Sequence, residues 1–329
     1  MWLFLVRRIA ALGGVLLAMT VVLFALQQLV PADPARALMG PNAPNSLVEQ
    51  KRKEMGLDRP MPVRYARYLY QLAHGDLGQS ISTHQPVTQD LAHFAPATLE
   101  LIAAALLLGC LLGAAVALPQ ALRPSIGGLR LALIGAASVP IFLTGLLLPL
   151  LFWYQLGWLP GGGRISPDNF HPGPTGFMTL DAIITGQPRM LLDSLAHLVL
   201  PAVTLALPIA VSVGRTLASS LQEVYTQGYI RTARAKGLSE GRVLIRHALR
   251  NAAGPPLTMV SLQVAMIFSN ILIVERLFAW PGLGSYMVQA FASADLPAVL
   301  GVAIVSAVTY LAVAAIVDIL RALLDPRLG

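Results

Sequence analysis

The chain alternates between long apolar runs and polar connections, and six of the runs approach the length of a membrane span. An α-helix rises about 1.5 Å per residue, so roughly 20 apolar residues cross the hydrocarbon core of a bilayer. The pattern therefore predicts an all-α membrane protein with six transmembrane helices. The predicted spans are residues 9–30, 98–118, 131–153, 195–213, 257–274 and 298–317.

Composition agrees with this pattern. Hydrophobic residues make up 56% of the chain and charged residues 12%, whereas soluble domains average roughly 45–50% and about 25%. The first apolar run follows Arg7 and Arg8, as a secretory signal would, and Ala35-Arg-Ala37 is similar to a cleavage site. Signal sequences have apolar cores of only about 7 to 15 residues. Because this run is longer, we expect a retained helix.

The distribution of Lys and Arg sets the expected orientation, because short cytoplasmic loops of membrane proteins collect positive charge. Arg7 and Arg8 place the N-terminus in the cytoplasm, and Arg123 and Arg130 place the second connection there. The first loop, the third loop and the loop after residue 274 then face outward, and both chain ends are cytoplasmic. The fourth connection is the most basic and carries Arg215, Arg231, Arg234, Lys236, Arg242, Arg246 and Arg250.

The net charge of +7 would suggest a nucleic-acid partner in a soluble protein. Here it reflects the excess of positive charge in cytoplasmic loops, together with attraction to anionic lipid headgroups. The single cysteine, Cys110, lies in a predicted span, so the chain can form no disulfide within itself. We therefore expect membrane lipid, and no nucleic acid, as a consequence of the charge.

Several kinds of chemistry lack their residues in this sequence. A nucleotide-binding phosphate loop needs a lysine directly after a glycine, and none of Lys51, Lys53 and Lys236 has one. The chain also has no His-Glu-x-x-His zinc motif and no Gly-x-Ser-x-Gly nucleophile motif. We therefore expect neither an ATPase site nor a membrane hydrolase, and no resident metal or cofactor.

Ionisable side chains are rare in the predicted spans, although ion-coupled carriers usually keep them along the transport pathway. Glu100, Arg215 and Asp318 lie near span ends. His197 lies early in the fourth span, where a hydrogen-bonded histidine is favoured over a proton relay. Energy for uphill transport is therefore expected to come from another protein.

Two further features concern the packing of the spans. Gly109 and Gly113 are four residues apart in the second span, a spacing that lets another helix approach closely. Prolines within helices remove a backbone hydrogen bond and cause kinks. Kinks are expected at Pro140 and Pro149 in the third span and at Pro201 and Pro208 in the fourth.

Four separated stretches together resemble one protein family. They are residues 55–60 (MGLDRP) with 75–80 (GDLGQS), residues 95–100 (APATLE), residues 229–237 (YIRTARAKG) with 246–251 (RHALRN), and residues 275–284 (ERLFAWPGLG) with 325–327 (DPR). In this order they are similar to the inner-membrane permease subunits of binding-protein-dependent ABC importers, in the dipeptide and oligopeptide branch.

The resemblance implies a type I importer (MetI-like) permease fold with a periplasmic insertion after the first helix. It implies four partners: a second homologous permease, two cytoplasmic ATPase subunits that bind ATP and Mg, and a periplasmic solute-binding protein. The location would be the bacterial inner membrane. The substrate would be a di- or oligopeptide, or a related nickel chelate or glutathione.

The same resemblance assigns the basic fourth connection to contact with an ATPase. A helix, a break at Gly237 and a second short helix from about Ser239 would form a hairpin, in which Arg242, Arg246 and Arg250, spaced by four residues, form one ridge. The general family has Glu-Ala-Ala where this chain has Arg231-Thr-Ala233, so contacts of that glutamate do not carry over. The residues expected to couple to the ATPase are Arg231, Ala233, Arg234, Lys236, Gly237, Ser239, Arg242 and Arg246.

Two other interpretations of the hairpin remain open. Its arginines could bind anionic headgroups without any protein partner. A helix-turn-helix that binds DNA has a similar order of elements, but the neighbouring membrane spans would hold the duplex against the bilayer. The lipid interpretation is therefore the stronger of these two.

The outer side offers two candidate surfaces. A short helix is expected at residues 63–72, with Tyr65, Leu69 and Leu72 on one face, either as a contact for the binding protein or as a lid on the permease. The segment after the fifth span is either an outer gate or a simple re-entrant turn. Its candidate gate residues are Glu275, Trp280, Pro281, Gly282 and Gly284.

The expected organisation has three parts: an N-terminal helix in residues 1–30, a periplasmic region in 31–97, and a transmembrane core in 98–329 that contains the coupling loop 215–255. The expected function is the permease subunit of an ATP-driven importer. The alternative is a channel or secondary carrier that works alone.

Overall fold

The computed structural model describes residues 13–22, 24–25, 34–40, 42–122, 135 and 138–324. Over these ranges the protein is helical and has no strand, apart from one isolated bridge between Gln79 and Pro86. The helices of the first part are α2 (Pro34–Met39), α3 (Asn45–Met55), α4 (Met61–Ala73) and α5 (Val87–Leu122). The helices that follow are α7 (Ile141–Pro149), α8 (Met178–Ile184), α9 (Pro188–Tyr225), α13 (Gly254–Leu277), α14 (Leu283–Ala292) and α15 (Leu296–Leu324).

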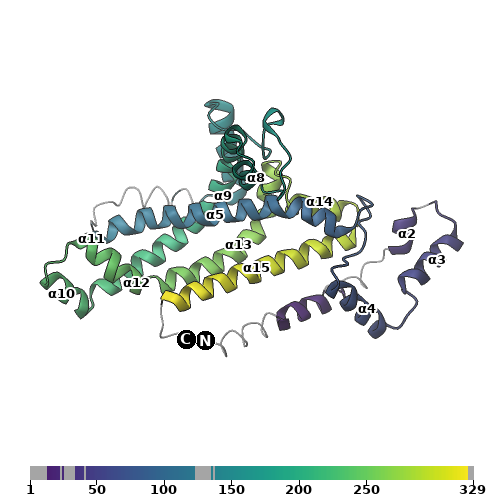
Figure 1. Ribbon diagram of the computed structural model, residues 1–329, viewed down its shortest axis with the longest axis horizontal. Helices are drawn as coiled ribbons and strands as arrows, with labels where there is room; N and C mark the ends of the chain where they lie inside the picture. The colour runs from purple at the N-terminus through teal and green to yellow at the C-terminus, as the bar shows by residue number, and fades with distance from the viewer. Residues whose placement is uncertain are drawn as a thin grey trace. The chain divides into compact units, whose positions relative to one another are not determined.

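Four described helices are long and apolar enough to cross a membrane: α5, α9, α13 and α15 (Figure 1). They contain the predicted second, fourth, fifth and sixth spans and extend beyond them, because helical structure continues into polar residues at the span ends. The predicted first and third spans fall partly outside the described residues. Their described parts are shorter apolar helices at Gly13–Val22 and Ile141–Gln155.

The chain divides into two compact units. Unit 1 contains Met1–Phe94 and Tyr286–Thr309, and unit 2 contains Ala95–Ser285 and Tyr310–Gly329. In unit 1 two buried carboxylates fix the loop that precedes α5. Asp295 accepts hydrogen bonds from Ser80 Oγ (2.5 Å) and Ser82 N (3.0 Å), and Asp90 accepts one from Tyr286 Oη (2.7 Å). The residue 75–80 motif thus ends on a buried serine.

The helix predicted at residues 63–72 is confirmed as α4, which has Pro62 in its first turn. Tyr65, Leu69 and Leu72 are half-buried, whereas Tyr70 on the same helix is exposed. Tyr65 Oη lies 2.9 Å from Thr20 Oγ1, so α4 contacts the first apolar helix within unit 1. The predicted amphipathic face is therefore the packed face.

Unit 2 is built around α9. In the most apolar 18 residues of each helix, 61% of α9 is buried inside the protein, compared with 28% of α13. Helix α9 is therefore the central helix of this unit. The two helices lie side by side (Figure 1), and α7 packs against both. Their shared core includes Leu205, Ile209, Ile267 and Ile271.

Helices α5 and α9 approach each other closely at glycines. A Cβ added to Gly113 would lie 2.8 Å from Ala210 O and 3.0 Å from Gly214 N, and one added to Gly109 would lie 2.7 Å from Ile209 Cβ. Contacts this short are not found for real Cβ atoms, so both positions require glycine. The close helix approach expected from the glycine spacing is confirmed.

The expectation for the prolines is partly wrong. Pro140 does not interrupt a helix: it is the N-cap of α7, with extended backbone (φ −54°, ψ 140°). Proline disfavours helical backbone at the residue before it, so a helix begins after it more readily than it continues through it. Pro149 ends α7 and precedes a π-helical turn, η1 (Leu150–Gln155), while Pro201 and Pro208 lie inside the continuous helix α9.

We predict that Gly113→Leu destabilises unit 2, because the added side chain must separate α5 from the α9 backbone. Overpacking of this kind costs about 1–3 kcal/mol. Thermal unfolding of the purified protein in mild detergent measures the effect. Gly14→Leu is the control, since no described atom lies within 4 Å of a Cβ added there. Equal unfolding temperatures for the two variants would contradict the close α5–α9 contact.

Candidate functional site

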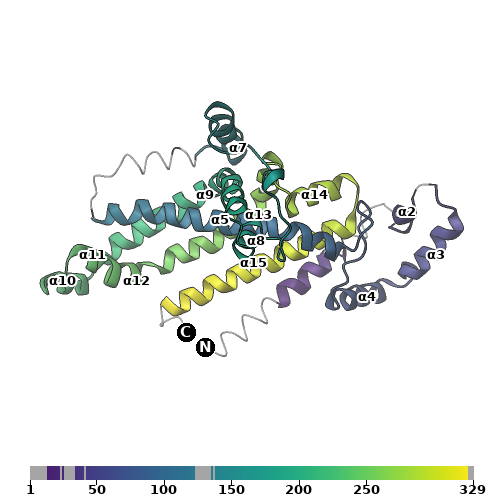
Figure 2. The ribbon, with the colours of Figure 1, turned by 45° about the horizontal axis from the view of Figure 1, so that its top comes forward.

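The basic connection between α9 and α13 folds as the expected hairpin. It consists of α10 (Gly228–Ala235), α11 (Glu240–Val243), a π-helical turn η3 (Leu244–Ala248) and α12 (Leu249–Ala252). The break is at Gly237, whose φ of +78° favours glycine, and Ser239 is the N-cap of α11. Figure 2 shows the hairpin at one end of α9 and α13.

An ion pair closes the turn of the hairpin. Arg234 Nε and Nη2 donate to the two carboxylate oxygens of Glu240 at 2.7 and 3.0 Å, and the guanidinium lies 5.2 Å from the centre of the Tyr225 ring. The hydrogen bonds from Arg234 hold the pKa of the Glu240 carboxyl below its usual range. Exposed pairs of this kind contribute at most about 1 kcal/mol to stability, so the pair defines the turn geometry more than it stabilises the fold.

Apolar residues attach the hairpin to the helices beneath it. Ile230, Ala233 and Val243 are buried, and they form one cluster with Leu221 of α9 and Ala117 of α5. Ala233, one of the expected coupling residues, therefore packs inside the hairpin and presents no side chain to solvent. The hairpin is therefore packed directly on α5 and α9.

The solvent-exposed side chains of the hairpin include several arginines and two large residues, Ile245 and Tyr229. Ile245 is 71% exposed and Tyr229 is 44% exposed. The π-helical turn η3 interrupts the four-residue repeat expected to align Arg242, Arg246 and Arg250 as a ridge, although all three remain exposed. The other expected coupling residues that are exposed are Arg231, Arg234, Lys236, Gly237 and Ser239.

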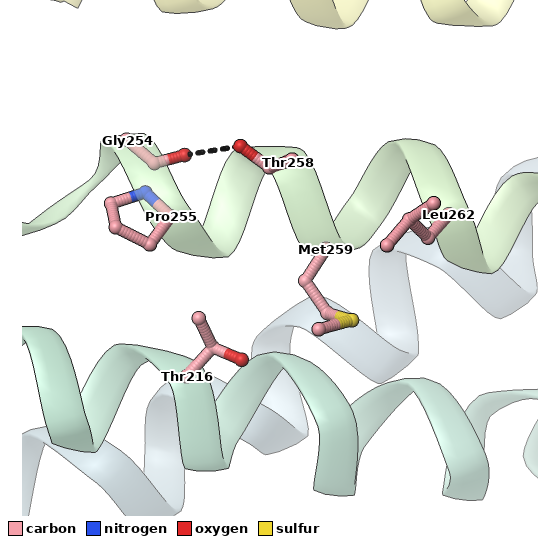
Figure 3. Close-up of a pocket in the computed structure, with 6 residues that line it drawn as sticks. All are labelled: Thr216, Gly254, Pro255, Thr258, Met259 and Leu262. Atoms are coloured by element: carbon pink, nitrogen blue, oxygen red, sulfur yellow. Dashed lines mark hydrogen bonds between the residues drawn. The ribbon is translucent and has the colours of Figure 1, made fainter.

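A groove lies beside the hairpin, between the C-terminal part of α9 and the N-terminal part of α13. Figure 3 shows Thr216 of α9 facing Met259 of α13 across it. Its volume is about 460 Å³. The remaining lining residues are Gly254, Pro255, Thr258 and Leu262. The groove thus lies between the two helices that the hairpin connects.

The candidate gate residues come together at the other end of α13, around a buried carboxylate. Glu275 is fully buried and accepts hydrogen bonds from Thr98 Oγ1 (2.6 Å) and Ser285 N (3.0 Å). Thr98 Oγ1 in turn accepts one from Leu283 N (2.7 Å). A buried charge is costly unless it is hydrogen-bonded, so these bonds fix the chain on both sides of the turn.

The turn itself is tightly packed. Trp280 is buried, and its Nε1 donates to Ala97 O at 2.9 Å. A Cβ on Gly282 would overlap the Glu275 carboxylate, and one on Gly284 would lie 2.8 Å from Leu272 Cα. Glycine is therefore required at both positions by close contact, whereas Pro281 is exposed.

Sequence reasoning missed a second buried carboxylate site next to this turn. Arg164, in the loop that follows η1, donates to Glu100 Oε2 through Nε (3.1 Å) and Nη2 (2.6 Å). The sequence placed Glu100 near a span end but gave it no partner, and the structure shows it buried and paired with Arg164. One feature of the sequence could have pointed to Arg164: it follows three glycines, residues 161–163, in a loop with few positive charges.

Two smaller points concern other polar residues. His197 Nδ1 lies 2.9 Å from Asp193 O, which confirms the expected hydrogen-bonded histidine. Within the ranges that the structure describes, no group of three or more His, Cys, Asp or Glu could hold a metal ion.

Comparison with known proteins places the chain in a family. Residues 136–329 match the model of the binding-protein-dependent transport system inner membrane component, and residues 1–102 match the N-terminal model of the same kind of membrane component. The chain is 39% identical to the probable D,D-dipeptide transport system permease protein of Escherichia coli K12, over 100% of this chain and 98% of that protein.

Two further relatives are similar over almost their whole length. The chain is 37% identical to the di/tripeptide transport system permease protein of Pseudomonas aeruginosa and 32% identical to the glutathione transport system permease protein of Salmonella paratyphi A. Each comparison covers 99% of this chain and 98% of the relative. With the helical fold, the hairpin and the glycine-rich turn already described, these matches show that the chain belongs to the family of binding-protein-dependent transport system inner membrane components.

Proposed function

We propose that the chain is the permease subunit of an ATP-driven importer that moves di- or oligopeptides across the bacterial inner membrane. The observation that carries this proposal is the hairpin, which packs on α5 and α9 and exposes arginines together with Ile245 and Tyr229. An exposed apolar side chain surrounded by positive charge is suited to a protein partner. Full-length similarity to peptide permeases supports the substrate class.

The partners follow from the same proposal. The chain would form half of a pore with a second homologous permease, and two cytoplasmic ATPase subunits would bind ATP and Mg. A periplasmic binding protein would deliver the solute. Residues 31–97 would form the periplasmic region and residues 98–329 the transmembrane core, with both chain ends in the cytoplasm. Similarity to a glutathione permease keeps glutathione among the candidate substrates, and nickel chelates remain a further candidate class.

The groove connects the hairpin to transport. ATP-driven closure of the ATPases would displace the hairpin, and the hairpin would move the inner parts of α9 and α13 that line the groove. A ligand shifts an equilibrium between two conformations only if it binds them with different affinity. ATP would favour the state that is closed on the inner side, and the loaded binding protein would favour the state that is open on the outer side.

The competing function is a channel or secondary carrier that needs no ATPase. We predict that vesicles containing this chain and its partner permease take up no peptide, and that uptake requires both ATPases, ATP and the binding protein. The measurement is accumulation of a labelled dipeptide in proteoliposomes. Uptake by this chain alone, without nucleotide, would establish the competing function.

Ile245→Asp is predicted to lower ATPase binding and peptide uptake by about tenfold or more, because central apolar contacts of an interface each contribute about 1–2 kcal/mol or more. Folding should be unaffected, since the side chain is exposed. Co-purification of the ATPases and uptake by cells measure the effect. Ile184→Asp, at an apolar position of α8 that is 57% exposed, lies outside the hairpin and is the matched control for co-purification of the ATPases, which it should leave unchanged. If both variants behave alike, the hairpin does not bind the ATPase.

The groove is expected to narrow when ATP is bound. In a Cys110→Ala background, Thr258→Cys introduces a single thiol at an exposed position of the groove. We predict that a small thiol reagent added from the inner side modifies it about tenfold more slowly in the ATP-bound, hydrolysis-arrested complex than without nucleotide. Equal rates in the two states would mean that the hairpin does not control the spacing of α9 and α13.

A further inference from the structure

The outer loop of unit 2, residues 156–187, is held by one buried carboxylate. Glu100 Oε2 accepts both hydrogen bonds from Arg164, and Glu100 Oε1 accepts hydrogen bonds from Thr179 N (2.8 Å) and Thr179 Oγ1 (2.5 Å). The side chains of Glu100 and Arg164 are almost fully buried. Two distant parts of the loop are therefore tied to the same point of α5.

The same loop contacts the gate segment, residues 275–285. The Arg164 guanidinium carbon lies 6.0 Å from the centre of the Trp280 ring. Gly163 N donates to Phe278 O at 2.7 Å, and a Cβ on Gly162 would lie 2.7 Å from that oxygen. Arg164 therefore contacts α5 through charge and the gate segment through the ring of Trp280.

One short stretch of α5 also holds the gate segment directly. Ala97 O accepts the hydrogen bond from Trp280 Nε1, and Thr98 Oγ1 joins Glu275 to Leu283 N. Glu100, which holds the outer loop, is two residues further along the same helix. The outer loop and the gate segment therefore share one attachment, and a displacement of either changes the contacts of the other.

We propose that Arg164 is a positioning residue for transport, through which a load on the outer loop moves the gate segment. This proposal rests on the proposed function, because it requires a binding protein that presses on the outer side. Arg164 contacts no substrate: it transmits the displacement by binding Glu100 and covering Trp280. A buried arginine forms two directed hydrogen bonds and stacks on an aromatic ring, which a lysine cannot do in the same geometry.

A purely structural role makes a different prediction. If the Glu100–Arg164 pair only stabilises the outer loop, removing it lowers the unfolding temperature but leaves the response of the ATPase to the binding protein unchanged. If the pair transmits the displacement, the response is lost even in protein that folds. The double variant Glu100→Gln/Arg164→Met separates the two cases, because it leaves no unpaired buried charge.

The experiment uses the complete importer in proteoliposomes and measures the ratio of ATP hydrolysis with and without the peptide-loaded binding protein. We expect this ratio to fall at least about fivefold in Arg164→Met and in the double variant, and Arg164→Lys to restore it in part. The matched control is Asp193→Asn. Asp193 holds the same loop by accepting hydrogen bonds from Ser166 N (2.6 Å) and Ser166 Oγ (3.0 Å), and among the described residues it forms no hydrogen bond with the gate segment. Its ratio should stay close to that of the unchanged protein.

Three outcomes overturn the proposal. The ratio could be unchanged in the folded double variant, it could fall equally in Asp193→Asn, or Arg164→Lys could match Arg164→Met. If the unchanged importer shows no response to the binding protein, the proposed function itself fails, which is a separate result. Thermal unfolding of each complex shows whether the double variant is folded.

Discussion

Two buried, hydrogen-bonded carboxylates hold together the part of unit 2 that contains the turn after α13 and the loop between η1 and α9. They are Glu275 and Glu100. Glu275 and Glu100 lie in a region of low polarity, where an unpaired charge would be very costly. Each therefore requires donors from segments that are far apart in the sequence, such as Thr98 with Ser285, and Arg164 with Thr179. The folding of the outer loop and of the turn after α13 follows from this requirement.

The hairpin between α9 and α13 is held by a different kind of contact. The hairpin is attached by apolar packing of Ile230 and Val243 on α9, and its polar contacts, such as that between Arg234 and Glu240, are exposed. Apolar packing has no strong directional preference, whereas hydrogen bonds to a buried carboxylate do. The region around the turn after α13 is thus joined by directional contacts, whereas the hairpin is joined to α9 by a close-packed apolar surface.

The sequence was sufficient for the long helices, because apolar length alone identifies them, and for the hairpin, because Gly237 marks its break. The candidate gate residues were named from the glycines and the position of the segment after the fifth span, and their role as a gate stays a prediction. Their arrangement around Glu275 was not predictable, since the partner Thr98 is 177 residues away. Arg164 was missed for the same reason: its importance lies in a contact with Glu100 across the fold. The predicted ridge of Arg242, Arg246 and Arg250 is interrupted by the π-helical turn η3. A π-helical turn leaves no clear signal in the sequence.

The exposure of Ile245 has a consequence for biosynthesis. If the hairpin binds an ATPase as proposed, a single chain that has entered the membrane without that partner leaves this side chain and Tyr229 uncovered. Apolar surface in water favours association with whatever protein is at hand. Balanced production of all subunits would therefore protect the cell from adhesive, incomplete assemblies, and an excess of this chain would be a burden even if every copy folded correctly.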